Sequence, residues 1–269
     1  MTGKANNGGF VDITLKFKEL TTIRLLTEFF GSFTVVYFSN WAFLQSKLVE
    51  NKNSTSNYAI VVGMIMCIMS YLGSKHSGGI YNPGVCFALL CAKAMKMSVF
   101  VAYVAVQFLA GFLACITIWR QQSFSTLLLI EDMKIYFGTP NTELEAFEDG
   151  NDEWAGVFAP MLITFAYILG FVIITIVYLY CLIERKFDRN LYGIVIGALY
   201  CFMIVCNNNA VPGCYNPIRI AGNLMTFQIS STQFFMLISP FIGAPIGTIV
   251  YKNMIAEEDI MAVFEDDEA

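Results

Sequence analysis

Six long apolar segments constrain this chain more than any other feature. They run approximately over residues 22–44, 58–73, 98–119, 155–183, 191–206 and 233–251. A helix that spans a bilayer needs about 20 predominantly apolar residues, and these segments approach or exceed that length. Only 14% of the 269 residues are charged, whereas soluble domains carry about 25%. The sequence therefore predicts an all-α integral membrane protein with six transmembrane helices.

Two shorter apolar stretches, at about residues 82–95 and 216–228, each begin at Asn-Pro. Proline is favoured in the first turn of a helix, so each stretch is predicted to be a re-entrant half-helix that starts inside the membrane. Non-helical backbone is tolerated at that depth only where it is buried in protein or lines a cavity.

The spacing of these features indicates an internal duplication. Gly63 lies 19 residues before Asn82, and Gly197 lies 19 residues before Asn216. We expect one repeat at about residues 22–120 and a second at about 155–251. Three spans per repeat is an odd number, so the second copy is predicted to be inverted in the membrane.

The basic residues predict the orientation. If both termini are cytoplasmic, eleven Lys and Arg residues lie inside and five outside. Residues 1–21 are then a cytoplasmic N-terminal segment, and residues 252–269 form an acidic cytoplasmic tail. The sequon at Asn53 falls in an outward loop and is a candidate for glycosylation.

Several function classes find little support in the composition. The net charge of −5 provides no basic patch for nucleic acid. The eight cysteines lie in apolar stretches without metal-ligand spacing, and His76 is the one histidine. We therefore predict no metal site, no cofactor and no His-assisted catalytic triad.

Three groups of residues resemble the signatures of the major intrinsic protein family, the aquaporins and aquaglyceroporins. Residues 25–33 (LLTEFFGSF) are similar to its first helix. Residues 77–85 (SGGIYNPGV) and 216–219 (NPIR) are similar to its two pore loops. The resemblance covers about residues 22–251 and implies an aquaporin-like inverted repeat with one pore per subunit of a homotetramer.

The resemblance implies that the Asn82 and Asn216 amides donate hydrogen bonds to the permeant near the midplane. The alternative is that each asparagine is only a helix cap. The resemblance also implies a ladder of backbone carbonyl acceptors leading to the asparagines, formed by Gly78, Gly79, Ile80, Tyr81, Pro212, Gly213, Cys214 and Tyr215.

The selectivity filter of the family maps by counting from the asparagines onto Val62, Ile204, Gly213 and Arg219. Two aliphatic members predict a filter that is wider and poorer in donors than a strict water filter, with room for a small polyol. The residue after Arg219 points the other way, because Ile220 stands where glycerol channels usually carry Asp.

Glu28 is an intramembrane carboxylate, which the resemblance implies to buttress a pore loop by accepting backbone N–H bonds. The alternative is a protonated glutamate that faces another helix. The family repeats this Glu in the fourth helix, where this chain has Thr164 or a neighbour. We expect the second loop to be held less tightly, or by Gln107 and hydroxyl groups.

The leading interpretation is a passive channel for water and small uncharged solutes, glycerol among them, in the plasma membrane or an intracellular vacuole-type membrane. The alternative is a structural or adhesion protein of the same fold with little conduction. Gly84 and Ile218 keep this alternative open, because the family usually has Ala after each Asn-Pro. An intramembrane enzyme lacks a plausible catalytic group.

Overall fold

The computed structural model describes residues 17, 19–48, 54–125, 153–183, 188–206, 215–219 and 231–254. Every regular element in these ranges is a helix. The elements are α2 (Thr22–Leu48), α3 (Ser54–Gly73), α4 (Pro83–Cys91), α5 (Met97–Ser125), α8 (Glu153–Ile183), the 3₁₀ turn η1 (Arg189–Leu191), α9 (Tyr192–Cys206) and α11 (Ser231–Met254).

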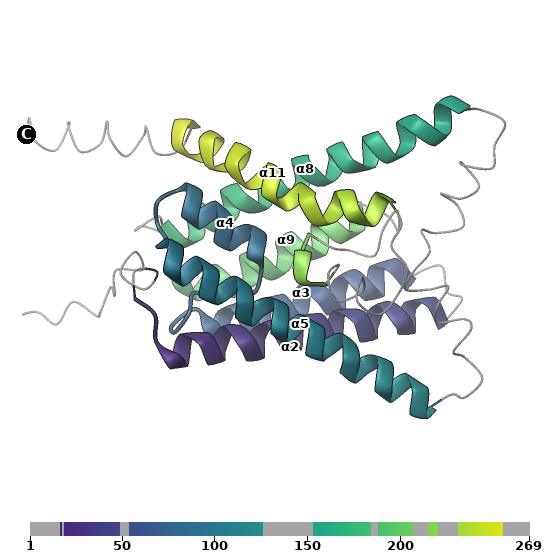
Figure 1. Ribbon diagram of the computed structural model, residues 1–269, viewed down its shortest axis with the longest axis horizontal. Coiled ribbons are helices and arrows are strands. Elements are labelled where there is room, and N and C mark those ends of the chain that lie inside the picture. The colour runs from purple at the N-terminus through teal and green to yellow at the C-terminus, as the bar shows by residue number, and fades with distance from the viewer. Residues whose placement is uncertain are drawn as a thin grey trace, which may run out of the picture.

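The helices pack as two halves related by the internal repeat. Figure 1 shows α2 and α5 along one side, α8 and α11 along the other, and α3 with α9 between them. The α3–α9 crossing depends on two glycines at equivalent places, since a Cβ on Gly63 would lie 2.7 Å from the Gly197 carbonyl oxygen. The glycines 19 residues before each asparagine therefore bring the two repeats into contact.

The polarity of the described helices is reversed relative to a soluble protein. Large apolar side chains are exposed on every long helix, including Phe30 on α2, Leu162 on α8 and Ile249 on α11. Polar groups such as Glu28 and Gln107 are fully buried instead. This pattern suits helices whose outer faces contact lipid.

Length and hydropathy agree with that environment for part of the bundle. Within the described residues, Met97–Ile118 and Thr164–Ile183 are long and apolar enough to cross a membrane, and Asn57–Gly73 and Tyr192–Cys206 are shorter apolar helices.

The first half-helix is α4, which begins at Pro83 with Asn82 as its N-cap. It lies between the two halves, because it contacts α5, α8 and α11. From α11, Thr248 Oγ1 lies 3.4 Å from the Ala88 carbonyl, and Lys252 Nζ lies 3.5 Å from the Cys91 carbonyl. In the second repeat, residues 217–219 are helical, and residues 220–230 lie outside the described ranges.

Residue 17 also belongs to the packed body. The Phe17 side chain is buried against Gly78, and its carbonyl accepts a hydrogen bond from the Lys96 amide. The N-terminal segment therefore contributes at least this residue to the base of the first loop.

Candidate functional site

The two asparagines meet at the contact between the repeats. The Asn82 amide nitrogen donates to the Tyr215 carbonyl at 2.6 Å, and the Asn216 amide nitrogen donates to the Tyr81 carbonyl at 2.8 Å. Each asparagine thus bonds the residue that precedes the other asparagine. This reciprocal pair lies between two helix N-termini, whose free N–H groups and partial positive charge favour oxygen ligands and oppose cations.

Each asparagine also caps its own half-helix. Asn82 Oδ1 accepts from the Gly84 amide at 2.9 Å, and Asn216 Oδ1 accepts from the Ile218 amide at 3.3 Å. The cap uses the side-chain oxygen, whereas the contact between repeats uses the side-chain nitrogen. The cap therefore leaves both amide hydrogens of each asparagine free to donate, and in Asn82 two protein acceptors, the Tyr215 carbonyl and the Tyr200 hydroxyl, already take them.

Glu28 on α2 organises the first loop. Its carboxylate accepts from the Ser77 hydroxyl at 2.5 Å, the Ile80 and Tyr81 amides at 3.2 and 3.0 Å, and the Gln107 side-chain amide at 2.8 Å. Four donors on two oxygens suit an ionised carboxylate. Glu28 thus accepts two backbone N–H bonds and two side-chain hydrogen bonds, and three of these four donors belong to the first loop.

The backbone of this loop needs such support. Tyr81 has φ of 51°, a left-handed conformation that is costly for a non-glycine residue. Its hydroxyl donates to the Met69 carbonyl at 2.9 Å. Its ring fills space left by Gly31 and Gly73, where an added Cβ would collide with it.

The second repeat replaces the carboxylate by an aromatic ring. A Cβ on Gly170 would lie 2.6 Å from the Tyr215 ring, so Gly170 is the counterpart of Gly31. Tyr167 stands three residues before Gly170, as Glu28 stands three before Gly31. The Tyr167 ring stacks on Tyr215 with centroids 4.9 Å apart.

Two expectations about the second loop require correction. The position that matches Glu28 is Tyr167, since the glycine contacts set the register that the sequence alone placed near Thr164. Gln107 supports the first loop, because its amide nitrogen bonds Glu28 and lies 3.4 Å from Cys86 Sγ.

Arg219 is buried between α2 and α3. Its Nε donates to Asn40 Oδ1 at 2.5 Å, and one terminal nitrogen donates to the Tyr58 hydroxyl. The guanidinium carbon also lies 5.5 Å from the Phe43 ring centroid and 5.3 Å from that of Tyr58. Two acceptors and two aromatic rings therefore hold this buried cation in position.

The remaining filter candidates are partly described. Val62 and Ile204 are both buried, on α3 and α9. Val62 lies one helical turn after Tyr58 on the same face of α3. Because Tyr58 contacts the Arg219 guanidinium, Val62 lies one turn away from that contact. Three second-loop candidates lie outside the described residues, namely Pro212, Gly213 and Cys214.

Three carbonyls of the expected ladder that lie in the described residues already accept hydrogen bonds from protein groups. The Tyr81 and Tyr215 carbonyls accept from the two asparagines. The Gly79 carbonyl accepts from the Ser70 hydroxyl at 3.2 Å and the Tyr192 hydroxyl at 3.4 Å. Protein donors thus engage both lone pairs of the Gly79 carbonyl, whereas the Tyr81 and Tyr215 carbonyls each accept a hydrogen bond from one asparagine, which takes one of the two lone pairs of a carbonyl oxygen.

The unusual residues after each Asn-Pro are matched by their neighbours. A Cβ on Gly84 would lie 2.5 Å from the Phe171 ring and 2.8 Å from Pro240 Cβ. Ile218 instead packs against Gly111, where an added Cβ would lie 3.2 Å from the Ile218 Cβ. The absence of a side chain at Gly84 thus leaves room for the Phe171 ring and Pro240, and the absence of one at Gly111 leaves room for Ile218.

Three residues of the site were missed from the sequence, although each carries a signal there. Tyr58 stands four residues before Val62, and Tyr200 stands four before Ile204, so each shares a helix face with a filter candidate. The Tyr200 hydroxyl accepts from the Asn82 amide at 2.8 Å. Asn40 is a polar residue inside an apolar segment, which is the signal that could have found it.

Among the residues that the structure describes, there is no group of three or more His, Cys, Asp or Glu side chains that could hold an ion.

Comparisons with known proteins agree with this geometry. A family model described as "Major intrinsic protein" matches residues 16–251. Aquaporin NIP3-1 of Arabidopsis thaliana is 23% identical over 228 residues, which cover 85% of this chain and 66% of that protein. Glycerol uptake facilitator protein-like 6 of Lactiplantibacillus plantarum is 20% identical over 237 residues, covering 87% and 99%. The X-ray structure of the aquaglyceroporin from Plasmodium falciparum superposes with a TM-score of 0.69 at 15% identity, covering 90% of this chain and 97% of that one.

Proposed function

Because this chain belongs to the major intrinsic protein family of integral membrane channels, we propose that it is a passive channel for water and small uncharged solutes, glycerol among them. Permeants would move down their own gradients without a cofactor or a covalent step. The observation that carries this proposal is the reciprocal pair of hydrogen bonds from Asn82 to the Tyr215 carbonyl and from Asn216 to the Tyr81 carbonyl, which brings the starts of the two half-helices together.

Electrostatics support exclusion of ions. Two helix N-termini and the buried Arg219 guanidinium put positive potential along one path, which opposes cations and protons. Neutral hydroxyl-bearing molecules can instead accept a hydrogen bond from Asn216. Aliphatic Val62 and Ile204 would contact the carbon atoms of a small polyol.

The assembly and orientation belong to the same proposal. We place both termini in the cytoplasm, residues 22–251 in the bilayer-embedded channel domain, and four copies in a homotetramer with one pore each. The apolar outer faces of the long helices provide the lipid-facing surface.

Reconstitution into liposomes tests the proposed function. Stopped-flow light scattering after a sucrose or glycerol gradient should give permeabilities above those of protein-free vesicles. Asn216→Asp should lower them, because it replaces a donor by a carboxylate at a positive helix end. If the permeabilities for water and for glycerol both equalled those of protein-free vesicles, conduction by the unmodified protein would be refuted.

One observation favours a second candidate, a structural membrane protein of this fold with little conduction. Tyr200 bonds the amide of Asn82 at the centre of the site, where a permeant would need it. The same reconstitution distinguishes the two candidates.

A further inference from the structure

The two central asparagines differ in how many of their side-chain amide hydrogens are bonded to protein acceptors. The Asn82 amide nitrogen has two hydrogens, and the protein provides an acceptor for each, the Tyr215 carbonyl at 2.6 Å and the Tyr200 hydroxyl at 2.8 Å. Within the described residues, the Asn216 amide has a single acceptor, the Tyr81 carbonyl at 2.8 Å. One central donor is therefore engaged and the other is available.

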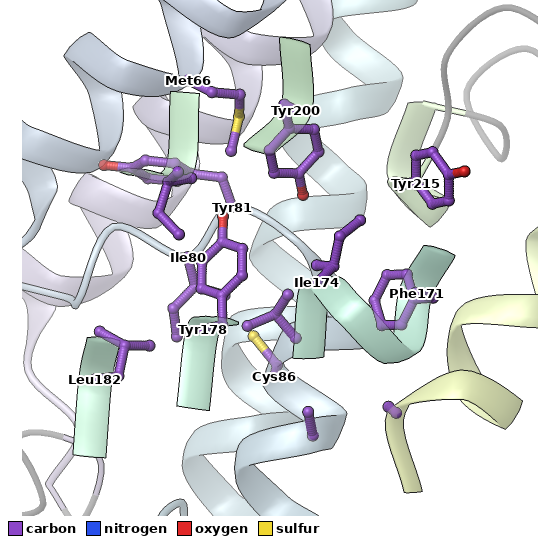
Figure 2. Close-up of a cluster of buried hydrophobic side chains, with 14 of the residues drawn as sticks. Met66, Ile80, Tyr81, Cys86, Phe171, Ile174, Tyr178, Leu182, Tyr200 and Tyr215 are labelled. Carbon is purple, nitrogen blue, oxygen red and sulfur yellow. The ribbon is translucent and has the colours of Figure 1, made fainter. Parts of the chain in front are cut away.

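The inverted repeat explains this asymmetry through a pair of equivalent residues. Tyr200 follows Gly197 by three residues, and Met66 follows Gly63 by three, and these glycines contact each other across the α3–α9 crossing. Both side chains are buried, and Figure 2 draws both in the same cluster of buried side chains. A thioether is at best a weak acceptor, so Met66 leaves its asparagine free where Tyr200 engages the other.

Tyr200 lies on α9 between the filter candidate Ile204 and Tyr192, whose hydroxyl bonds the first loop. It lies one helical turn from Ile204 on α9, on the same helix face. The next aromatic hydroxyl on α9 belongs to Tyr192, which bonds the Gly79 carbonyl.

A polyol is affected more than water by the loss of a central donor. Glycerol carries three hydroxyl groups on a carbon chain, so it must satisfy several polar groups at once and also needs width. A polar group that leaves water without a replacement partner pays its desolvation cost. The Tyr200 ring occupies space, and its hydroxyl removes one donor, so both effects act against glycerol.

We propose that Tyr200 is a specificity-determining residue at the centre of the channel, where it withdraws the Asn82 amide and disfavours glycerol relative to water. The inference rests on the proposed function and deepens it. It also assigns Met66 the complementary role of leaving Asn216 open.

Exchange of the two equivalent residues tests the inference in proteoliposomes. Tyr200→Met should raise glycerol permeability roughly three- to ten-fold, which corresponds to the net free energy of one hydrogen bond. It should raise water permeability by a smaller factor. Met66→Tyr should lower both. Phe202→Met is the matched control, since Phe202 is an exposed aromatic residue on the same helix, and it should change neither. An unchanged ratio of glycerol to water permeability in Tyr200→Met would overturn the proposal.

A stability measurement examines the hydrogen bond whether or not the unmodified protein conducts. In a double-mutant cycle of Asn82→Ala and Tyr200→Phe in detergent, the two changes in Tm should be non-additive if the side chains are bonded. Additive changes would overturn the inference. A different outcome is that the unmodified protein gives only the lipid-baseline permeability while Tyr200→Met conducts. That outcome would reject the proposed function alone and support the role of Tyr200.

Discussion

Asn40 Oδ1 accepts a 2.5 Å hydrogen bond from Arg219 Nε, although the two residues are 179 positions apart and belong to different repeats. The first helix of one repeat therefore orients the charged group of the other. Asn40 is itself held by its amide nitrogen, which lies 3.4 Å from Cys115 Sγ on α5. Selectivity at Arg219 should thus depend on a residue outside both pore loops.

Replacement of Asn40 should loosen Arg219. Asn40→Ala removes the acceptor of a buried cation, and a hydrogen bond to a charged group contributes about 1.5–3 kcal/mol. We expect a lower Tm in detergent and a higher ratio of glycerol to water permeability in liposomes. Asn40→Asp keeps an acceptor and should retain more of the selectivity. If Asn40→Ala had the same Tm and the same selectivity as the unmodified protein, its aromatic neighbours alone would position Arg219.

Val62 should control the width next to Arg219. Val62→Phe adds a ring one turn from Tyr58, and this should reduce glycerol flux much more than water flux, because water passes a narrow section in single file. Stopped-flow measurements of water and glycerol permeability, on liposomes with equal amounts of each protein, test this difference in flux. Val61→Phe, at a partly exposed neighbouring position, is the control. An equal loss of both fluxes in Val62→Phe would place Val62 outside the filter.

Replacement of Glu28 should destabilise the folded protein more than replacement of its partner Gln107. Glu28→Gln puts an amide nitrogen among the four donors that now surround two carboxylate oxygens, so at least one buried donor loses its acceptor at a cost of about 1–3 kcal/mol. We expect less folded protein after extraction and a lower Tm. Gln107→Ala removes one of the four donors and should lower the Tm less. A larger loss from Gln107→Ala would mean that the loop depends chiefly on Gln107.

Gly84 should not tolerate the Ala that is usual after Asn-Pro in this family. Gly84→Ala places a Cβ 2.5 Å from the Phe171 ring, and overpacking of this kind costs about 1–3 kcal/mol. Phe171→Leu makes room for the added methyl group, so the double variant should be more stable than the sum of the single changes predicts. Additive losses of Tm would exclude a direct clash.

Tyr167 should stabilise the second loop through its ring. Tyr167→Ala removes a buried aromatic side chain, and such changes cost about 3–5 kcal/mol. Tyr167→Phe keeps the ring stacked on Tyr215 and should cost about 1 kcal/mol. Thermal unfolding in detergent compares them. Equal losses from the two variants would assign the support to the hydroxyl group.

Much of the fold could be predicted from the sequence, because lipid and backbone hydrogen bonding leave few solutions. Apolar segments of spanning length must be helices, and a polar Asn-Pro between them must be buried in protein. Equal glycine-to-asparagine spacings revealed the inverted repeat. The asparagines, Arg219 and Glu28 could be found because polar groups at that depth are costly and need a reason.

The tertiary structure alone decided which groups those polar residues meet. Hydrogen bonds such as Asn82 to Tyr200 and Arg219 to Asn40 join residues more than 100 positions apart, so no local spacing encodes them. The register of the second repeat also required contacts, since only the packing of Gly170 on Tyr215 identifies Tyr167 as the counterpart of Glu28. The sequence determined the membrane helices and the central asparagines because burial in lipid acts on each segment separately. Which of the two asparagine amides stays available depends on how side chains from both repeats share one small space.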